Sequence, residues 1–226
     1  CQDGKDIKAG GFQSSGQAVR SDERTFLGKY QVKLENGYMT DYAKIDEKAP
    51  VAEGYHEWFA YLEVSGDHPW FNNQAYLNTL DKAAVQRFIE VTHEEYYKLL
   101  GDEFGKTVPA IFTDEPQFSH KKTLGFADEK TDVTLPYTDD LEETFKAAYG
   151  HSLLDHLPEL FWELGDDKVS RIRYEYHDHI AERFADAFAD TIGAWCKEHG
   201  IMLTGHMMEE PSLYTQTAAL GEAMRS

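Results

Sequence analysis

A short apolar run that stops at two carboxylates constrains the fold of this chain more than any other stretch. Residues 108–112 read Val-Pro-Ala-Ile-Phe, and after Thr113 the chain continues with Asp114, Glu115 and Pro116. A run of this length and composition predicts a buried strand of a parallel sheet. Pro116 lacks a backbone donor and favours an extended Glu115, so the strand must end here. Neighbouring side chains of a strand point to opposite faces, so Asp114 and Glu115 are predicted to have different roles.

The elements around this strand alternate between strand and helix. Residues 55–64 are rich in aromatic and β-branched types and predict a strand. A helix is predicted from an N-cap at Asp81 to Gly101. With residues 108–112 these form a strand–helix–strand unit, which implies parallel strands joined by a right-handed crossover. Three helical patterns follow, over residues 139–149, 152–164 and 170–199. One further short apolar strand is predicted over residues 201–204.

This order of elements predicts an α/β fold, namely an incomplete (β/α)8 TIM-type barrel. A complete barrel needs about 250 residues, and we expect this chain to hold about five strands. A long helical insertion is predicted after the Asp114–Glu115 strand. Residues 1–54 form an N-terminal loop and β-hairpin region, with the hairpin over 26–45, and residues 55–226 form the barrel segment. A truncated barrel has open sheet edges, so self-association is expected.

Composition excludes several classes of partner. The formal net charge is -19, from 41 acidic and 22 basic residues, and such a chain is repelled by nucleic acids and anionic membranes. No stretch approaches ~20 apolar residues, so no membrane span is predicted. Cys1 and Cys196 indicate neither a disulfide framework nor a zinc site. Cys1 fits the lipid-bearing residue of a processed lipoprotein or, the interpretation we favour, the cut edge of a longer protein. A cytoplasmic and an extracytoplasmic bacterial location both stay open.

Two carboxylates on the rim of such a fold are typical of the catalytic residues of a glycosidase. Glu115 is the predicted proton donor, and Asp114 is predicted to bind a substrate hydroxyl or to hold Glu115 in place. The second catalytic carboxylate is predicted to be Glu210 or Glu209, which follow the strand at 201–204. Solvated acids that merely end a strand are the alternative interpretation.

The loop after residues 55–64 is dense in aromatic and amide side chains. Aromatic faces stack on the apolar side of a sugar ring, and amides bond its hydroxyls. A loop that folds its aromatic residues into a local core is the alternative. Together with a histidine after the last strand, the predicted substrate-binding residues are Trp70, Asn72, Asn73, Tyr76, Asn78 and His206.

A metal site is a weaker interpretation of the same region. His206 and Glu210 are four residues apart and could share a helical face, but two ligands are too few for a metal centre. His177 and His179 lie in a helical pattern with side chains about 200° apart, so one metal ion cannot take both. No cofactor is predicted, and a structural cation such as calcium stays open.

The strand-end residues Phe112 to Pro116 resemble the Asn-Glu-Pro motif of the large retaining (β/α)8 glycosidase clan. In that clan the Glu is the acid/base and the Asn contacts the sugar 2-hydroxyl, which implies the acid role for Glu115. Asp114 stands in place of the Asn. A longer pattern resembles the bacterial hydrolases of the family 106 α-L-rhamnosidase type. It consists of Asp114 to Phe118, Trp195 to Gly200, Thr204 to His206, Glu210 and Gln216.

This resemblance implies a bacterial glycoside hydrolase that acts on an oligo- or polysaccharide of plant or host origin, with α-L-rhamnoside as a candidate substrate. Two alternatives from other classes stay open. One is a metal-dependent hydrolase that uses His206, Glu210 and the acids near Asp114. The other is a non-catalytic carbohydrate-binding protein that uses the loop around Trp70. Retention or inversion depends on the separation of the two carboxylates, which the sequence does not give.

Overall fold

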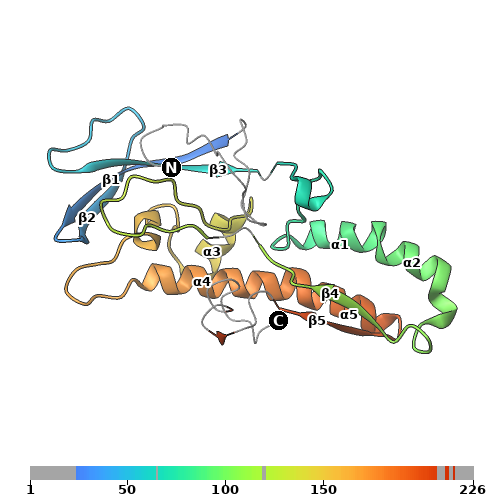
Figure 1. Ribbon diagram of the computed structural model, residues 1–226. Coiled ribbons are helices and arrows are strands. Elements are labelled where there is room, and N and C mark those ends of the chain that lie inside the picture. Colours follow the sequence, from blue (N-terminus) through green and yellow to red (C-terminus); the bar gives the residue numbers. More distant parts are fainter. Residues whose placement is uncertain (1–23, 65, 119–120, 208–211, 214–215, 217–226) are drawn as a thin grey trace. The chain divides into compact units, whose positions relative to one another are not determined.

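The computed structural model describes residues 24–64, 66–118, 121–207, 212, 213 and 216 (Figure 1). This part of the chain divides into two compact units. Unit 1 takes in the described residues up to Tyr76 and those from 121 to Tyr176. Unit 2 takes in the described residues from Leu77 to Phe118 and those from His177 onward.

Unit 1 contains a three-stranded antiparallel sheet in the order β2-β1-β3. Asn36 and Gly37 join the first two strands, and both have positive φ angles, 54° and 85°. Two-residue loops of this kind match the right-handed twist of a hairpin, so the predicted hairpin is confirmed. The strands are β1 (Arg24–Glu35), β2 (Tyr38–Ile45) and β3 (His56–Glu63).

The pairing of β3 shows that the barrel prediction is wrong. We expected residues 55–64 to lie parallel to the strand at 108–112, but β3 pairs antiparallel with β1. The reason lies in the pattern of burial: Trp58 and Ala60 are buried, whereas Glu57 is exposed. Such alternation is typical of an antiparallel sheet with one covered face. The predicted barrel strands lie in two small sheets, of three and two strands, and the described residues form a mixed α/β fold without a barrel.

The interior of unit 1 is aromatic. The ring of Trp58 lies 5.2 Å from that of Tyr30 and 5.6 Å from that of Trp162. The segment after Pro116, predicted as a helical insertion into a barrel, instead contributes helices to this unit. Over residues 152–164 only a 3-10 turn forms, and it begins beside Pro158, which removes a helix hydrogen bond. The helices are α3 (Leu141–Tyr149), η3 (Leu157–Leu160) and the start of α4 (Arg171–Phe184).

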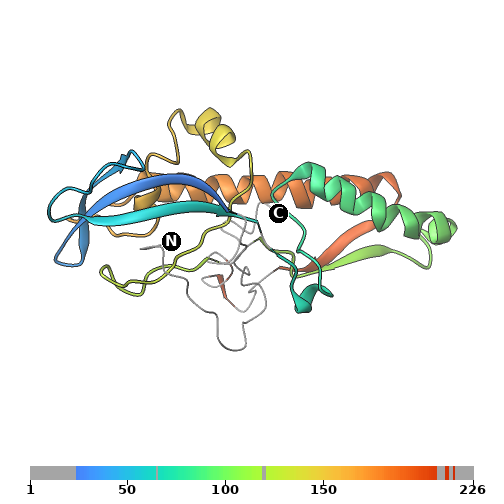
Figure 2. The same cartoon turned by 90° about the horizontal axis from the view of Figure 1, so that it is seen from above.

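Unit 2 contains a two-stranded parallel sheet and the helices that cover it (Figures 1 and 2). The sheet consists of β4 (Ala110–Asp114) and β5 (Met202–His206). Both predicted strands are present, but the prediction that they are buried is wrong, because neither contains a buried residue and Phe112 and Met202 are exposed. Helix α5 lies against β5, and α1 lies against α5 and the π-helical segment η4. Besides the end of α4, the helices are α1 (Lys82–Val91), α2 (His93–Leu100), η2 (Gly101–Glu103), η4 (Ala185–Asp190) and α5 (Thr191–Glu198).

The helix predicted between Asp81 and Gly101 is present but broken. The Asp81 carboxylate accepts a hydrogen bond from Ala83 N at 2.9 Å, as expected of an N-cap. At Thr92 the backbone leaves the helical region with φ -123°, and the Thr92 hydroxyl donates to the carbonyl oxygen of Phe88. A hydroxyl that bonds back to the preceding turn competes with the helix, which accounts for the break between α1 and α2.

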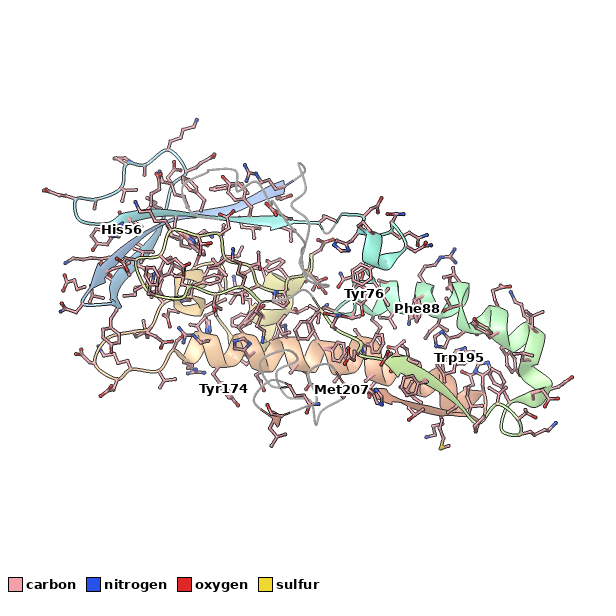
Figure 3. All side chains as sticks on the ribbon, in the orientation of Figure 1. His56, Tyr76, Phe88, Tyr174, Trp195 and Met207 are labelled. Carbon is pink, nitrogen blue, oxygen red and sulfur yellow. The ribbon has the colours of Figure 1, made fainter. Side chains whose placement is uncertain are left out.

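Buried aromatic side chains hold the helices of unit 2 together (Figure 3). The His93 ring is buried between Phe88 at 5.2 Å and Trp195 at 5.1 Å. Trp195 also donates from its indole nitrogen to Glu94 at 2.7 Å. No helix in the described part of the chain is long and apolar enough to cross a membrane, which agrees with the sequence-based expectation.

Candidate functional site

The carboxyl ends of β4 and β5 lie side by side because the two strands pair in parallel. Asp114 is the register partner of His206, and Phe112 is the partner of Thr204. Partners in a parallel pair project from the same face of the sheet. The Oδ1 atom of Asp114 consequently lies 3.6 Å from Nδ1 of His206. The ends of the two strands therefore bring a carboxylate and an imidazole together, although 92 positions separate them in the chain (206 minus 114).

The register of this pair depends on Gly205. A Cβ atom on Gly205 would lie 1.9 Å from the carbonyl oxygen of Thr113 and 2.7 Å from its hydroxyl oxygen. Neither contact is sterically allowed, and the first involves backbone that cannot move aside within the strand. Glycine is the residue that permits such a close approach of two backbones. Gly205 lies within the Thr204 to His206 stretch of the sequence pattern, but the sequence did not predict this role.

Glu115 adopts a left-handed backbone conformation, with φ 49°. We expected an extended residue because Pro116 follows. The backbone NH of Glu115 donates to the carbonyl oxygen of His206 at 3.1 Å, so the strand pairing reaches one residue beyond Asp114. A left-handed conformation costs a residue with a side chain roughly 1–2 kcal/mol. The chain thus turns sharply at the carboxylate that the sequence singles out as the catalytic acid, and such strain often accompanies functional sites.

The site is open to solvent. The side chains of Asp114 and His206 are 74% and 56% exposed. The ring of Phe112 lies 5.1 Å from that of His206, nearly perpendicular to it, and Phe112 is itself exposed. This face of the β4–β5 sheet presents an aromatic ring beside polar groups, and an arrangement of this kind can bind a sugar.

The predicted substrate-binding loop belongs mainly to unit 1. Trp70 lies in the 3-10 helix η1 (Pro69–Phe71), and the structure does not describe its side chain. Asn72 and Asn73 have positive φ angles of 57° and 56° and form the turn that follows. The ring of Tyr76 lies 4.7 Å from that of Phe71. The Phe71–Tyr76 contact shows that part of the loop packs its aromatic rings against each other.

Asn78 is assigned to unit 2, where its side-chain oxygen accepts from Leu80 N at 3.2 Å. It therefore has a local structural role ahead of α1. Glu209 and Glu210 lie outside the described residues. Within the described part of the chain, no three His, Cys, Asp or Glu side chains are grouped so that they could hold a metal ion. His177 and His179 lie in α4, as the helical pattern predicts.

A connected polar cluster that was not predicted lies in unit 1. The Tyr42 hydroxyl donates to Glu159 Oε1 at 2.6 Å and lies 2.6 Å from His156 Nδ1. The other oxygen of Glu159 accepts from the Ser170 hydroxyl at 2.7 Å. Burial and the bond to Glu159 raise the pKa of Tyr42 well above its usual value. Tyr42 lies in β2 and Glu159 in η3, while His156 and Ser170 immediately precede η3 and α4. No motif or periodicity links these residues.

Comparison of the chain with known protein families, with curated proteins and with solved structures gives no match. A functional conclusion therefore depends on the side chains and their geometry.

Proposed function

We propose that this protein is a glycoside hydrolase whose active site lies at the carboxyl ends of β4 and β5. The observation that carries the proposal is the parallel pairing that brings Asp114, Glu115 and His206 to one edge of the sheet. Carboxylates gathered at the ends of parallel strands are a common way to build a catalytic site. The resemblance of Phe112 to Pro116 to a glycosidase strand-end motif supports the same assignment.

In this proposal Glu115 is the general acid that protonates the glycosidic oxygen as the bond to the leaving group breaks. A second group must then act from the other side of the sugar, either as a nucleophile or by activating water. Glu210 or Glu209, which follow β5, are the carboxylates available from the sequence for that role. The substrate class is an oligo- or polysaccharide, with α-L-rhamnosides as the first candidates. A neutral sugar is not repelled by the strong negative charge of the chain.

The role of Glu115 is tested by hydrolysis of aryl glycosides, α-L-rhamnosides included, with the wild-type chain and with Glu115→Gln. Loss of a general acid lowers the rate by about 10²–10⁴-fold. The loss is expected to be large for phenyl glycosides and small for dinitrophenyl glycosides, because a good leaving group needs no protonation. Glu90→Gln is the matched control, since Glu90 is an exposed carboxylate that pairs with Arg87 on the surface of α1.

Two results would contradict the proposal. One is an unchanged rate in Glu115→Gln with phenyl glycosides. The other is an equal loss for every leaving group, because that pattern indicates general damage to the protein and not the absence of an acid.

A further inference from the structure

We propose that His206 is the general base of this site and that Asp114 is its positioning residue. The inference rests on the proposed function and extends it. It replaces the two roles that the sequence suggested for Asp114, namely a contact to a sugar hydroxyl and support of Glu115. It also gives the activation of water to His206 in place of Glu210 or Glu209. It also assigns the reaction a stereochemical outcome, inversion at the anomeric carbon.

The first argument is the placement of the two side chains. They occupy paired positions of β4 and β5, so they leave the same face of the sheet at the same level. Gly205 and Thr113 fix that level, because any side chain at position 205 would overlap the Thr113 carbonyl. Asp114 therefore cannot move along the strand relative to His206 without breaking the pairing of the sheet.

The second argument is which ring nitrogen faces the carboxylate. Asp114 Oδ1 lies 3.6 Å from Nδ1 of His206, which leaves Nε2 as the nitrogen directed elsewhere. A carboxylate at Nδ1 holds the proton there, so the lone pair is placed on Nε2. The distance is longer than a hydrogen bond, and such contacts in unliganded sites often tighten when the substrate binds.

The third argument is the environment of the imidazole. The His206 ring lies 5.1 Å from the ring of Phe112. The backbone carbonyl of His206 accepts a hydrogen bond from Glu115 N at 3.1 Å. The ring is thus supported on one side by an aromatic residue and at its base by the strand end, while its side chain stays more than half exposed. A contact between polar side chains this exposed adds less than about 1 kcal/mol to stability. Its placement is better explained by the orientation that Asp114 gives to His206.

The step that follows from this arrangement is hydrolysis by activated water. A water proton passes to Nε2 of His206 while the water oxygen bonds to the anomeric carbon. The bond from that carbon to the glycosidic oxygen breaks, and this oxygen takes the proton of Glu115. His206 then releases its proton to solvent, and Glu115 takes one up. Because water attacks opposite the leaving group, the product has inverted configuration.

The pairing itself is tested by NMR of the full chain with ¹⁵N-labelled histidine, where His206→Ala identifies the His206 signals. We expect neutral His206 to carry its proton on Nδ1. In Asp114→Ala we expect the proton to move to Nε2, the tautomer that imidazoles prefer without a partner. Both residues are exposed, so neither variant should unfold the protein. A proton on Nε2 in the wild type, or the same tautomer in Asp114→Ala, would overturn the assignment of Asp114.

The catalytic role is tested by rescue. His206→Ala should lower the rate of aryl glycoside hydrolysis by about 10²–10⁴-fold, and added imidazole should restore part of it. Asp114→Ala should lower the rate less, and imidazole should not restore it. His56→Ala, which removes an exposed histidine from β3, serves as the control and should leave the rate unchanged. Full activity in His206→Ala, or a loss that imidazole does not relieve, would overturn the role of His206.

Two further readouts separate the competing explanations. Hydrolysis by the wild type should survive chelators, because loss of activity would make His206 a metal ligand and overturn its role as a base. The first product seen by NMR should be the inverted anomer, and a retained anomer would likewise overturn it. If the wild type hydrolyses no glycoside, the proposed function fails and the base role with it. The tautomer measurement still decides whether Asp114 orients His206.

Discussion

The polar cluster around Tyr42 in unit 1 and the candidate site in unit 2 differ in how far their titratable side chains are exposed. In unit 1, Tyr42 and Ser170 both donate to Glu159, whose side chain is only 15% exposed. In unit 2, Asp114 and His206 share a contact but remain largely exposed. A cluster whose bonds are satisfied internally has little capacity left for a ligand. The number of polar contacts is therefore a poor guide to function. Exposed polar side chains at a strand end, which can still hydrogen-bond a ligand, are a better guide.

The energetic consequences differ in the same direction. A buried hydrogen bond to a charged group contributes about 1.5–3 kcal/mol, whereas an exposed ion pair contributes less than about 1 kcal/mol. We therefore expect substitutions in the Tyr42–Glu159 cluster to act on stability and substitutions of the exposed side chains of Asp114 and His206 to act on function. The experiments below test this difference, beginning with the largest expected effect.

Replacement of Trp58 by Ala should have the largest effect on stability. Trp58 is buried among the rings of Tyr30, Phe161 and Trp162. Removal of a buried indole costs about 3–5 kcal/mol, measured as the shift of the urea unfolding curve. Hydrogen exchange should accelerate most in β1 and β3. Tyr38→Ala removes a half-exposed aromatic residue from β2 and should cost far less, so similar losses in the two variants would contradict the packing described for unit 1.

Gly205→Ala should be the most damaging small change in unit 2. The added methyl group would lie 1.9 Å from the Thr113 carbonyl oxygen, so β4 and β5 must separate. We expect a loss of about 2–3 kcal/mol in the free energy of unfolding, typical of overpacking, together with loss of the Asp114–His206 contact. Gly193→Ala is the matched control, because its methyl group would meet Leu203 at an ordinary 4.0 Å and favours the helix. Equal stability of Gly205→Ala and the wild type would show that the register is not set by this glycine.

Tyr42→Phe and Asp114→Ala test the two polar groups directly. Tyr42→Phe removes the donor to Glu159 and should cost about 1.5–2 kcal/mol in urea unfolding. Asp114→Ala should change stability by less than about 0.5 kcal/mol, because its contact is exposed. The opposite order, with Asp114 the more important for stability, would remove the distinction between the two units.

The smallest expected effect concerns the pH dependence of unit 2. Burial lowers the pKa of His93 below its usual 6.5, and Glu94 opposes this in part. The unfolded chain therefore takes up the proton more readily than the folded protein does. The contribution of neutral His93 to the free energy of unfolding is complete above pH 6.5. It is lost as the pH falls through 6.5 towards the pKa of His93 in the folded protein. His93→Phe should flatten this dependence when urea midpoints are compared at mildly alkaline and mildly acidic pH. An equal dependence in the variant would show that another group is responsible.

Much of the local structure could be predicted from short stretches of sequence. Asn36 and Gly37 predict the hairpin turn, Asp81 the start of α1, and Gly150 the end of α3. These features depend on backbone preferences and hydrogen bonds within a few residues, which sequence displays directly. The apolar runs that end in polar residues also predicted β4 and β5, and hence that Asp114 and His206 lie at strand ends.

The partners of these elements were decided only in the folded protein. β3 pairs with β1 and not with β4, and Tyr42 meets Glu159 across 117 positions of sequence. The left-handed turn at Glu115 likewise follows from continued pairing with β5, although Pro116 alone favours an extended residue. Each outcome depends on contacts between residues that are far apart in the sequence, and therefore on the free energy of the whole packed arrangement. Periodicity and capping motifs report on one segment at a time, so they predict where strands and helices form but not which of them meet.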